Sequence, residues 1–385
     1  MKKIVFCFLG LLAVLYTASA QSYTFNHGPY LQELSEHAVT FVFTTSDKGF
    51  SWVEVKPDGG EAERHYTVRN GLRDAYNTFN VIRVENLRPD TRYQYRLCSK
   101  QIADFQPYKV TFGDSIVSPW RRFSTPDPKA TACSFIALSD MHQQPDKLGR
   151  LLNQAGVGSA DMIFYVGDMM NYYDNEETPF RSFIDKSVEL FASEKPFVLV
   201  RGNHETRGNM AREYARYVPK SSGKYYGAYR VGDIMFVVLD CGEDKPDDFC
   251  VYAGLTDFDG YRTEQAAWFG ELIRSKAYKS AKWRIVMNHF PPLSHMEGDN
   301  PERHGIQDIT DKFLPLYNQA KIDLMISGHT HAYEFMSPDK YDRLTFPVIV
   351  NSTESVARID IDGRTLKAKV TDTGGNTLKE FTISK

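Results

Sequence analysis

The stretch "DLMISGHTHAYE" occupies residues 323–334. Its apolar run stops at Gly328 and is followed by His329 and His331. Short apolar runs that end in polar residues are typical of buried strands in α/β proteins, whose functional groups follow the carboxyl ends of the strands. Two imidazoles at one strand end suggest a common bound group, so the polar residues at the ends of the other strands become important.

The same pattern of a short apolar run followed by polar residues recurs along the chain after about residue 127. The other runs are "CSFIALSD" (133–140), "MIFYVGD" (162–168), "PFVLVRGN" (196–203), "IMFVVLD" (234–240), "WRIVMNH" (283–289) and "FPVIVNST" (346–353). Amphipathic stretches lie between them, at 145–156, 178–193, 263–277 and 308–321. Runs rich in Ile, Val, Phe and Met that alternate with helices indicate an α/β core with strands covered on both faces.

Five of these runs end in carboxylates, amides or imidazoles. The residues are Asp140, His142, Asp168, Asn203, His204, Glu205, His289, His329 and His331. One such histidine would more often be structural, but a convergent set of Asp, Asn and His without balancing Lys or Arg is costly to bury unless it binds a cation. Carboxylate, amide and imidazole ligands suit iron, manganese or zinc. The seven of these residues that we take as ligands, all but His204 and Glu205, exceed what one tetrahedral ion uses. The sequence therefore predicts two metal ions.

The full set resembles the calcineurin-like metallophosphoesterases over about residues 130–335. The matching motifs are Asp140-x-His142, Gly167-Asp168, Gly202-Asn203-His204-Glu205, His289 and Gly328-His329-x-His331. The resemblance implies a four-layer αββα sandwich over 127–345. It also implies that Asp168 bridges two ions, one held by Asp140, His142, Asp168 and His331 and the other by Asp168, Asn203, His289 and His329.

Two further histidines have roles implied by the resemblance. His204 resembles the family histidine that protonates the leaving group, and its alternative role is to support Asn203. His295, in "HFPPLSHMEGD" (289–299), resembles the substrate-facing histidine of purple acid phosphatases, although the spacing is shorter. The competing interpretation of His295 is a surface loop residue. Glu205 is expected to anchor its loop.

The sequence departs from purple acid phosphatases at one informative position. Those enzymes carry an iron-binding, colour-giving tyrosine three residues after the bridging aspartate, where this chain has Asn171. The nearest tyrosines, Tyr172 and Tyr173, come one and two residues later. In this interpretation His142 supplies the missing ligand. The sequence then does not specify which two metals bind, and a colourless protein is expected.

Residues 21–126 have a different hydropathy pattern, in which short alternating runs are separated by Gly, Asp and Pro. Runs such as "HAVTFVFTTS" (37–46) and "RYQYRLCS" (92–99) predict an antiparallel β-sandwich. "NLRPDTRYQYRL" (86–97) resembles the turn into the F strand of fibronectin type III domains, with Tyr93 as the corner tyrosine. "GPYLQ" (28–32) resembles the N-terminal domain of purple acid phosphatases. We expect this domain to pack beside an enzyme and shape its cleft, with a binding module as the alternative.

The C-terminal segment 346–385 is predicted to complete the catalytic domain as a β-meander. "DIDGRTL" (360–366) resembles the nucleophile strand of haloacid dehalogenases, but apolar residues alternate around Asp362-Gly363, which indicates a β-hairpin. "DTGG" (372–375) has no second copy elsewhere in the sequence, so the next turn of the meander is favoured over an aspartic protease motif.

The ends and the composition of the chain indicate where it acts. Residues 1–20 have a basic start, a short apolar run and Ala18-Ser19-Ala20, which predicts a cleaved signal peptide and a secreted or periplasmic protein with no membrane partner. A net charge of −3 gives no indication of nucleic-acid binding. An oxidising compartment would permit disulfides, Cys241–Cys250 among them, but four reduced thiols remain equally open.

The predicted activity is hydrolysis of small phosphate monoesters by attack of a metal-bound hydroxide. The same ions could serve a phosphodiesterase or a nucleotide pyrophosphatase. The alternative from a different class is a non-enzymatic ligand-binding or adhesion protein, which the intact ligand set disfavours. The sequence does not specify the oligomeric state.

Overall fold

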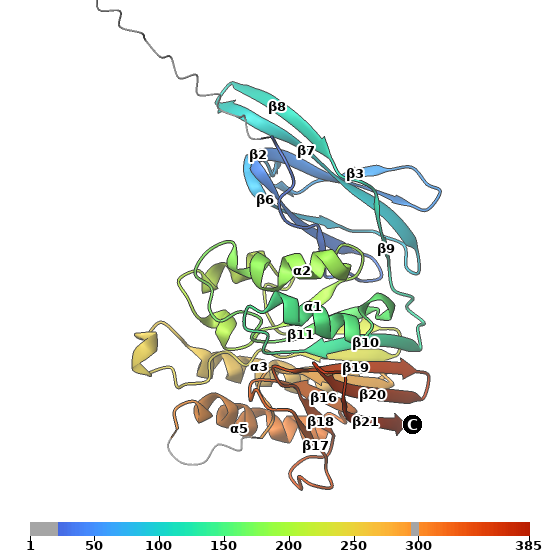
Figure 1. The fold of residues 1–385 in the computed structure, drawn as a ribbon, viewed down its shortest axis with the longest axis vertical. Helices are drawn as coiled ribbons and strands as arrows, with labels where there is room; N and C mark the ends of the chain where they lie inside the picture. The colour runs from blue at the N-terminus through green and yellow to red at the C-terminus, as the bar shows by residue number, and fades with distance from the viewer. Residues whose placement is uncertain (1–21, 294–299) are drawn as a thin grey trace, which may run out of the picture.

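The computed structural model describes residues 22–293 and 300–385. An all-β part comes first in the chain and an α/β part follows it (Figure 1). The predicted signal peptide at 1–20 and His295 lie outside the described residues.

The N-terminal part is built from one antiparallel seven-stranded sheet and a small two-stranded ribbon. The seven strands are β1 (Tyr30–Gln32), β2 (Val39–Pro57), β3 (Glu63–His65), β6 (Asn77–Val84), β7 (Arg92–Gln106), β8 (Lys109–Val117) and β9 (Arg121–Ser124), and the ribbon is β4 (Val68–Arg69) with β5 (Leu72–Arg73). The long β2 pairs with β6 up to a register shift after Thr44 and with β7 from Gly49 onward. It thereby joins β6 to β7 within the same sheet.

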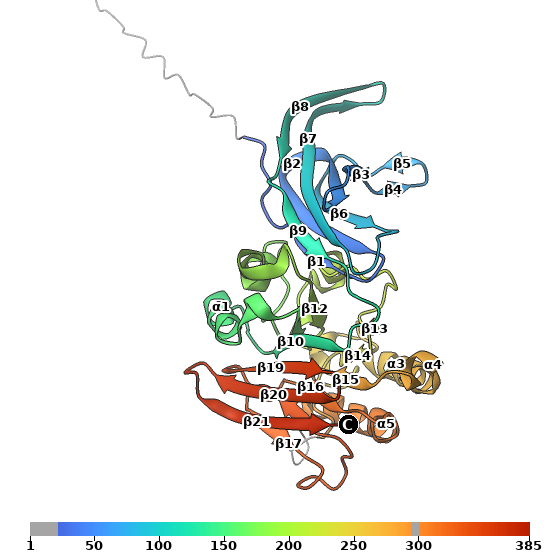
Figure 2. The same cartoon turned by 90° about the vertical axis from the view of Figure 1, so that its right-hand side faces the viewer.

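The predicted corner tyrosine makes the expected contact. The Tyr93 hydroxyl accepts a hydrogen bond from the backbone N–H of Arg88 at 2.8 Å, which is the short upstream contact of a tyrosine corner. The predicted all-β character is confirmed, while the fibronectin type III assignment stays a prediction. The β7–β8 hairpin extends beyond the rest of the sheet (Figure 2).

The α/β part contains two six-stranded sheets. The first has the order β12 (Phe197–Val200), β11 (Met162–Val166), β10 (Ala132–Leu138), β19 (Ser355–Asp362), β20 (Thr365–Asp372) and β21 (Thr377–Ser384). The second has the order β13 (Gly227–Val231), β14 (Ile234–Val238), β15 (Trp283–Met287), β16 (Leu324–Ser327), β18 (Val348–Val350) and β17 (Glu334–Met336). The predicted apolar strands form β12, β11 and β10 of the first sheet, with β12 at its edge, and β14, β15, β16 and β18 in the middle of the second sheet.

Helices cover the outer face of each sheet. Helix α1 (Pro145–Gln154) and the segment 180–192, which consists of π-helical turns around α2 (Asp185–Ser187), pack on the first sheet. Helices α3 (Phe258–Arg274) and α5 (Arg303–Gln319) pack on the second, and the short α4 (Lys276–Lys279) follows α3. A separate apolar core joins the inner faces of the two sheets. The four-layer αββα sandwich is therefore confirmed.

The element boundaries differ from the predictions in places. Helix α3 begins at Phe258 and α5 at Arg303, several residues before the predicted starts. The 346–385 segment is divided, because β18 joins the second sheet beside β16 and only β19–β21 form the meander. The predicted hairpin turn is confirmed, since Asp362 pairs with Thr365 across Gly363 and Arg364. The predicted domain boundaries after 126 and 345 stay predictions.

The four cysteines in the described part of the chain are all free thiols. Cys98, Cys133 and Cys241 are buried, and Cys250 is exposed. The structure therefore agrees with the alternative of four reduced thiols, and Cys241 does not pair with Cys250. Within residues 22–293 and 300–385, no helix has the length and apolar character needed to cross a membrane.

The β-sandwich rests on the helical layer of the first sheet. The Tyr30 hydroxyl donates to the carbonyl of Tyr217 at 2.8 Å, and the Tyr95 hydroxyl donates to that of Ser193 at 2.6 Å. The ring of His27 stacks on Phe180 with centroids 4.0 Å apart. Buried hydroxyls with backbone partners and stacked rings make a specific interface. The sandwich therefore packs beside the α/β part, while its expected role in shaping the cleft stays a prediction.

Candidate metal centre

The predicted ligands meet where strands of both sheets end. Strands β10, β11 and β12 of the first sheet lead to Asp140, His142, Asp168 and Asn203, while β15 and β16 of the second lead to His289, His329 and His331. Parallel strands share a carboxyl edge, so loops that are distant in sequence converge there. All seven residues predicted as ligands are brought together.

One group of ligand atoms comes from Asp140, His142, Asp168 and His331, and these atoms all lie within 4.8 Å of one another. We call this group the outer half-site, because the His331 side chain is 53 % exposed. The Nε2 atoms of His142 and His331 face each other at 2.9 Å. Two imidazole nitrogens aimed at one point fit a shared cation.

A second group contains Asp168, His289 and His329, again with ligand atoms within 4.8 Å of one another. Asn203 adds its amide oxygen, which lies 3.2 Å from His329 Nδ1. We call these four residues the inner half-site, because His289 is fully buried and Asp168 and Asn203 are each 1 % exposed. Asp168 belongs to both half-sites, as the resemblance implies for a bridging carboxylate.

Hydrogen bonds fix which nitrogen of two of the histidines faces the centre. His289 Nδ1 donates to the carbonyl of Val166 at 2.7 Å, so its Nε2 points at Asp168 Oδ2, 3.1 Å away. That buried Nε2 makes no hydrogen bond of acceptable geometry. His142 Nδ1 lies 3.2 Å from Asn171 Oδ1. Partners of this kind set the tautomer and orientation of metal-binding histidines.

Burial and neighbouring charges shift the protonation of the ligands. Burial lowers the pKa of His142 to about 4 and that of His329 to about 3, so both rings are neutral and able to bind metal at neutral pH. Burial alone would lower the pKa of His289 as well, but the carboxylate of Asp168 raises it to about 10. The same proximity holds the pKa of Asp168 well below its usual range. A cation between Asp168 and His289 would replace the proton that this pairing retains.

The backbone around the centre is held in an uncommon conformation. Five of the seven predicted ligands have positive φ, namely Asp140 (57°), His142 (45°), Asp168 (56°), His329 (73°) and His331 (56°). Left-handed non-glycine residues cost about 1–3 kcal/mol each and cluster at functional sites. The surrounding loops stabilise them, since the N–H of Asp140 donates to Gly167 and that of His142 donates to Asp168.

Close backbone approach explains two of the glycines in the motifs. A Cβ on Gly328 would lie 2.4 Å from Ser139 Oγ and 2.5 Å from Asp140 Oδ2, and one on Gly167 would lie 2.3 Å from His289 Nδ1. Any side chain at either position would displace a ligand or its support.

Glu205 organises the loop after β12, as expected. Its buried carboxylate accepts the backbone N–H groups of Asp168 at 2.9 Å, Met169 at 2.7 Å and Gly202 at 2.8 Å. Burial and the nearby Asp168 raise the pKa of Glu205 to about 7. Its oxygens are occupied by these donors, so it links the ends of β11 and β12.

The remaining predicted residues have different outcomes. His204 lies beside the centre, with its Nε2 3.9 Å from Asp168 Oδ2 and its Nδ1 2.7 Å from the carbonyl of Asn171. His295 falls outside the described residues. Tyr172 is exposed and Tyr173 packs in the first-sheet core, so neither belongs to the ligand groups.

Three residues near the centre were missed by sequence reasoning. Arg207 contacts His204, and Glu243 and Asp244 contact Arg207. A signal was present, because β14 also ends in carboxylates at the same edge of its sheet. For the segment after β14, the sequence indicated only a possible Cys241–Cys250 disulfide.

The donor set fits two divalent cations. The atoms facing the centre are carboxylate oxygens, an amide oxygen and imidazole nitrogens, which are ligands for iron, manganese or zinc. A bound cation would give a partner to His289 Nε2 and to the facing Nε2 atoms of His142 and His331.

Comparison with known proteins identifies the class that this fold and centre define. The calcineurin-like phosphoesterase family matches residues 133–333, and the chain belongs to that family.

Its relatives include purple acid phosphatases. It is 23 % identical over 277 residues to purple acid phosphatase 21 of Arabidopsis thaliana, covering 68 % of this chain and 55 % of that protein. It is 22 % identical over 357 residues to a purple acid phosphatase of Glycine max, covering 84 % and 70 %. The chain spans about half the length of the first Arabidopsis relatives that it matches.

Solved structures show the same fold. A purple acid phosphatase from yellow lupin (Lupinus luteus) superposes with a TM-score of 0.67 at 16 % identity, covering 92 % of this chain and 74 % of that one. A structure of PhoD gives a TM-score of 0.63 at 13 % identity, covering 92 % and 89 %. Both matches extend across the β-sandwich as well as the α/β part.

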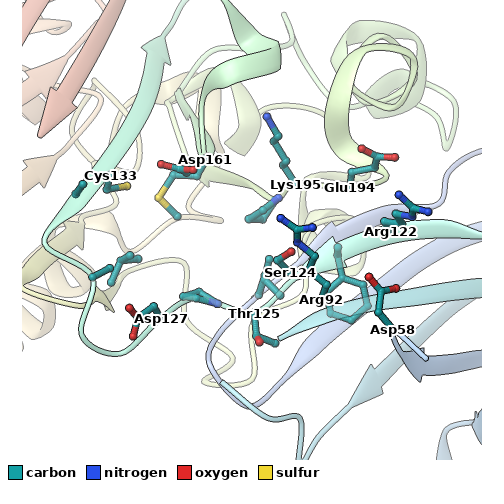
Figure 3. A pocket seen from close by; sticks show the side chains of 18 residues that line it. Asp58, Arg92, Arg122, Ser124, Thr125, Asp127, Cys133, Asp161, Glu194 and Lys195 are labelled. Atoms are coloured by element: carbon teal, nitrogen blue, oxygen red, sulfur yellow. The ribbon is translucent and has the colours of Figure 1, made fainter. Parts of the chain in front are cut away.

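Two cavities differ in their relation to the centre. One of about 660 Å³ adjoins it, because His329 lines it together with Leu293, Ile306, Tyr333 and Phe335. Another of about 520 Å³ lies between the β-sandwich and the α/β part, where Arg92 and Arg122 from one side and Glu194 and Lys195 from the other border the same space (Figure 3). None of the predicted site residues lines this second cavity.

Proposed function

We propose that the protein is an exported, metal-dependent phosphatase that hydrolyses small phosphate monoesters. The observation that carries this proposal is a pair of ligand groups that share Asp168. Membership of the calcineurin-like phosphoesterase family and the purple acid phosphatases among its relatives support it. The signal-peptide pattern at residues 1–20 supports export.

The outer half-site would hold one ion and the inner half-site the other, with Asp168 between them. When bound, a pair of divalent ions lowers the pKa of a water molecule toward about 7 and neutralises the charge of a phosphate group. Buried contacts hold two of the inner ligands, Asp168 and His289, in fixed positions. Such preorganisation lets the centre act on phosphate without rearranging its own dipoles.

His204 is the residue that we assign as general acid. Its Nδ1 is anchored to the carbonyl of Asn171, which leaves Nε2 facing the centre near Asp168. A proton at Nε2 could pass to the leaving-group oxygen of a bound ester, within the reach that such transfers require. His295 remains a predicted substrate contact.

The cavity of about 660 Å³ beside His329 offers space for the organic part of the substrate. Its apolar lining by Leu293, Ile306 and Phe335 favours esters with an apolar or aromatic group. The same space could admit the second organic group of a diester. A phosphodiesterase or nucleotide pyrophosphatase is therefore the second candidate function.

A phosphoester panel combined with metal analysis tests the proposal. Purified protein is assayed on monoesters, diesters and nucleoside diphosphates, before and after prolonged chelation, and its metal content is measured at each step. The expected result is monoester hydrolysis that disappears on chelation and returns with Mn(II), Zn(II) or Fe(II). Full activity in a verified metal-free sample would contradict the proposed mechanism, and a preference for diesters would favour the second candidate.

A further inference from the structure

Arg207 lies at the edge of the centre, at the end of the short turn that begins with His204. Its Nη1 is 3.1 Å from His204 Nε2. Because the Nδ1 of His204 faces a carbonyl oxygen, which only accepts, the neutral ring carries its hydrogen on Nδ1 and Nε2 accepts from Arg207. Nε2 can take up the proton that a general acid needs only when Arg207 Nη1 bonds elsewhere. His204 Nε2 is in turn 3.9 Å from Asp168 Oδ2. Only His204 therefore links this edge of the guanidinium to Asp168, the ligand that both half-sites share.

Two carboxylates hold the other face of the guanidinium. Arg207 Nε donates a hydrogen bond to Glu243 Oε1 at 2.7 Å, and Nη2 donates one to Oε2 at 3.1 Å. Asp244 receives Nη2 at 3.2 Å. A guanidinium has five N–H donors in a rigid fork, so this clamp occupies Nε and Nη2 and leaves Nη1 for the centre.

The clamp is itself buried and supported. Glu243 is 1 % exposed and Asp244 is 4 % exposed. Glu243 also accepts the Tyr252 hydroxyl at 2.7 Å and the Thr206 hydroxyl at 3.0 Å. Burial alone would raise the pKa of Glu243, but the hydrogen bonds from Arg207 lower it to about 2. Glu243 therefore remains ionised and keeps the guanidinium in place, whereas burial raises the pKa of Asp244.

The clamp also reaches a predicted ligand. Asn203 Nδ2 lies 3.4 Å from Asp244 Oδ2, and the amide oxygen of Asn203 faces His329. The carboxylate that holds Arg207 therefore also orients the amide of the inner half-site. Arginine and ligand are positioned as one unit.

We propose that Arg207 binds a non-bridging oxygen of the substrate phosphate through Nη1, and that it thereby makes the centre prefer dianionic monoesters to monoanionic diesters. The inference rests on the proposed phosphoesterase function. A phosphate oxygen is a stronger acceptor for a guanidinium N–H than a neutral imidazole nitrogen is, because the hydrogen bond is charge-assisted on both sides. A diester offers less negative charge and places a second organic group near the arginine.

The test compares Arg207→Lys with the unchanged protein on 4-nitrophenyl phosphate and bis(4-nitrophenyl) phosphate. Lysine keeps a positive charge for Glu243 and Asp244 but is a point charge, so it cannot serve the clamp and the phosphate together. The expected loss in kcat/KM is about 10- to 100-fold for the monoester, the size of one hydrogen bond to a charged group, and much smaller for the diester. The inhibition constant of inorganic phosphate should rise by a similar factor, with metal content unchanged.

Arg201→Lys is the matched control. Arg201 also pairs with a buried carboxylate, since its Nη2 lies 2.7 Å from Asp240 Oδ2, but its guanidinium stacks on Tyr225 and contacts none of the ligands among the described residues. Its substitution should leave the monoester-to-diester ratio unchanged. Equal losses on both esters in Arg207→Lys, with unchanged phosphate inhibition, would make Arg207 a structural support and overturn the proposal.

Phosphate binding separates this inference from the proposed function. If the unchanged protein hydrolyses neither ester, calorimetric titration of the metal-loaded protein with inorganic phosphate still tests Arg207. Weaker binding in Arg207→Lys than in Arg201→Lys supports a phosphate contact. Equal binding, or none in the unchanged protein, overturns it.

Discussion

The two half-sites of the centre share Asp168 and differ in how their histidines are buried and oriented. In the inner half-site His289 is fully buried and its ring is fixed by a backbone carbonyl. In the outer half-site His331 is more than half exposed, and His142 is oriented by a side chain, Asn171. Backbone contacts in a buried position resist displacement, whereas exposed side chains exchange partners with water. One centre therefore combines a rigid ligand set with an adaptable one.

Asp168→Asn should have the largest effect, because it removes the charge on which both half-sites depend. We expect loss of both ions and a fall of phosphoester hydrolysis to background, measured by elemental analysis and a monoester assay. Asp161→Asn is the control, since Asp161 is an exposed carboxylate that accepts the N–H of Ser134 at 2.8 Å. Retention of both ions in Asp168→Asn would show that the half-sites do not share a ligand.

His289→Ala and His331→Ala test the comparison directly. The His331 variant should lose only the outer ion and recover activity in excess metal, because solvent can replace an exposed ligand. The His289 variant should lose the inner ion, not recover, and melt at a lower temperature, since it leaves a cavity beside a buried carboxylate. Metal titration and thermal melts distinguish them. Identical behaviour of the two variants would refute a rigid inner half-site.

His204→Ala should change the rate without changing either half-site. We expect both ions to be retained and kcat to fall by about 10²- to 10⁴-fold on an alkyl phosphate, the usual contribution of general acid catalysis. The loss should shrink on 4-nitrophenyl phosphate, whose leaving group needs little protonation. Equal losses on both esters would assign His204 to positioning.

Asn171→Ala should weaken only the outer half-site. Asn171 orients His142 through Oδ1 and is itself held by Gln143, whose Oε1 accepts from Asn171 Nδ2 at 3.3 Å. Loss of such an outer partner typically costs about 10–100-fold in metal affinity. A competition titration with a metal indicator measures the outer ion. An equal weakening of the inner ion would contradict the division into two half-sites.

The smallest expected change is spectroscopic. The resemblance to purple acid phosphatases places Asn171 where those enzymes carry their iron-binding tyrosine; Tyr172 is exposed, and Tyr173 packs in the first-sheet core. Iron-loaded, oxidised protein should therefore lack a tyrosinate absorption band in the visible range. Such a band, lost on Tyr172→Phe or Tyr173→Phe, would prove this expectation wrong.

The sequence was sufficient for the layers and for the convergence of the ligands, because both follow from apolar strands and the residues at their ends. It was not sufficient for the start of α5, where residues from Arg303 extend the helix before its apolar periodicity becomes clear. Nor did it reveal the contact between Arg207 and Glu243, which depends on the bend of a short turn and on side-chain reach across two sheets. Contacts of that kind have no periodic signature.

The free thiols have a practical consequence. Burial raises the pKa of Cys98 to about 11 and that of Cys133 to about 12, and it raises that of Cys241 well above its usual range, so these sulfurs are poor nucleophiles. Cys250 is the exposed one within the described part of the chain, two residues from the Tyr252 that supports Glu243. Among the described cysteines, a maleimide fluorophore should therefore attach at Cys250. Its emission would give an optical readout of phosphate entry without any substitution in the protein.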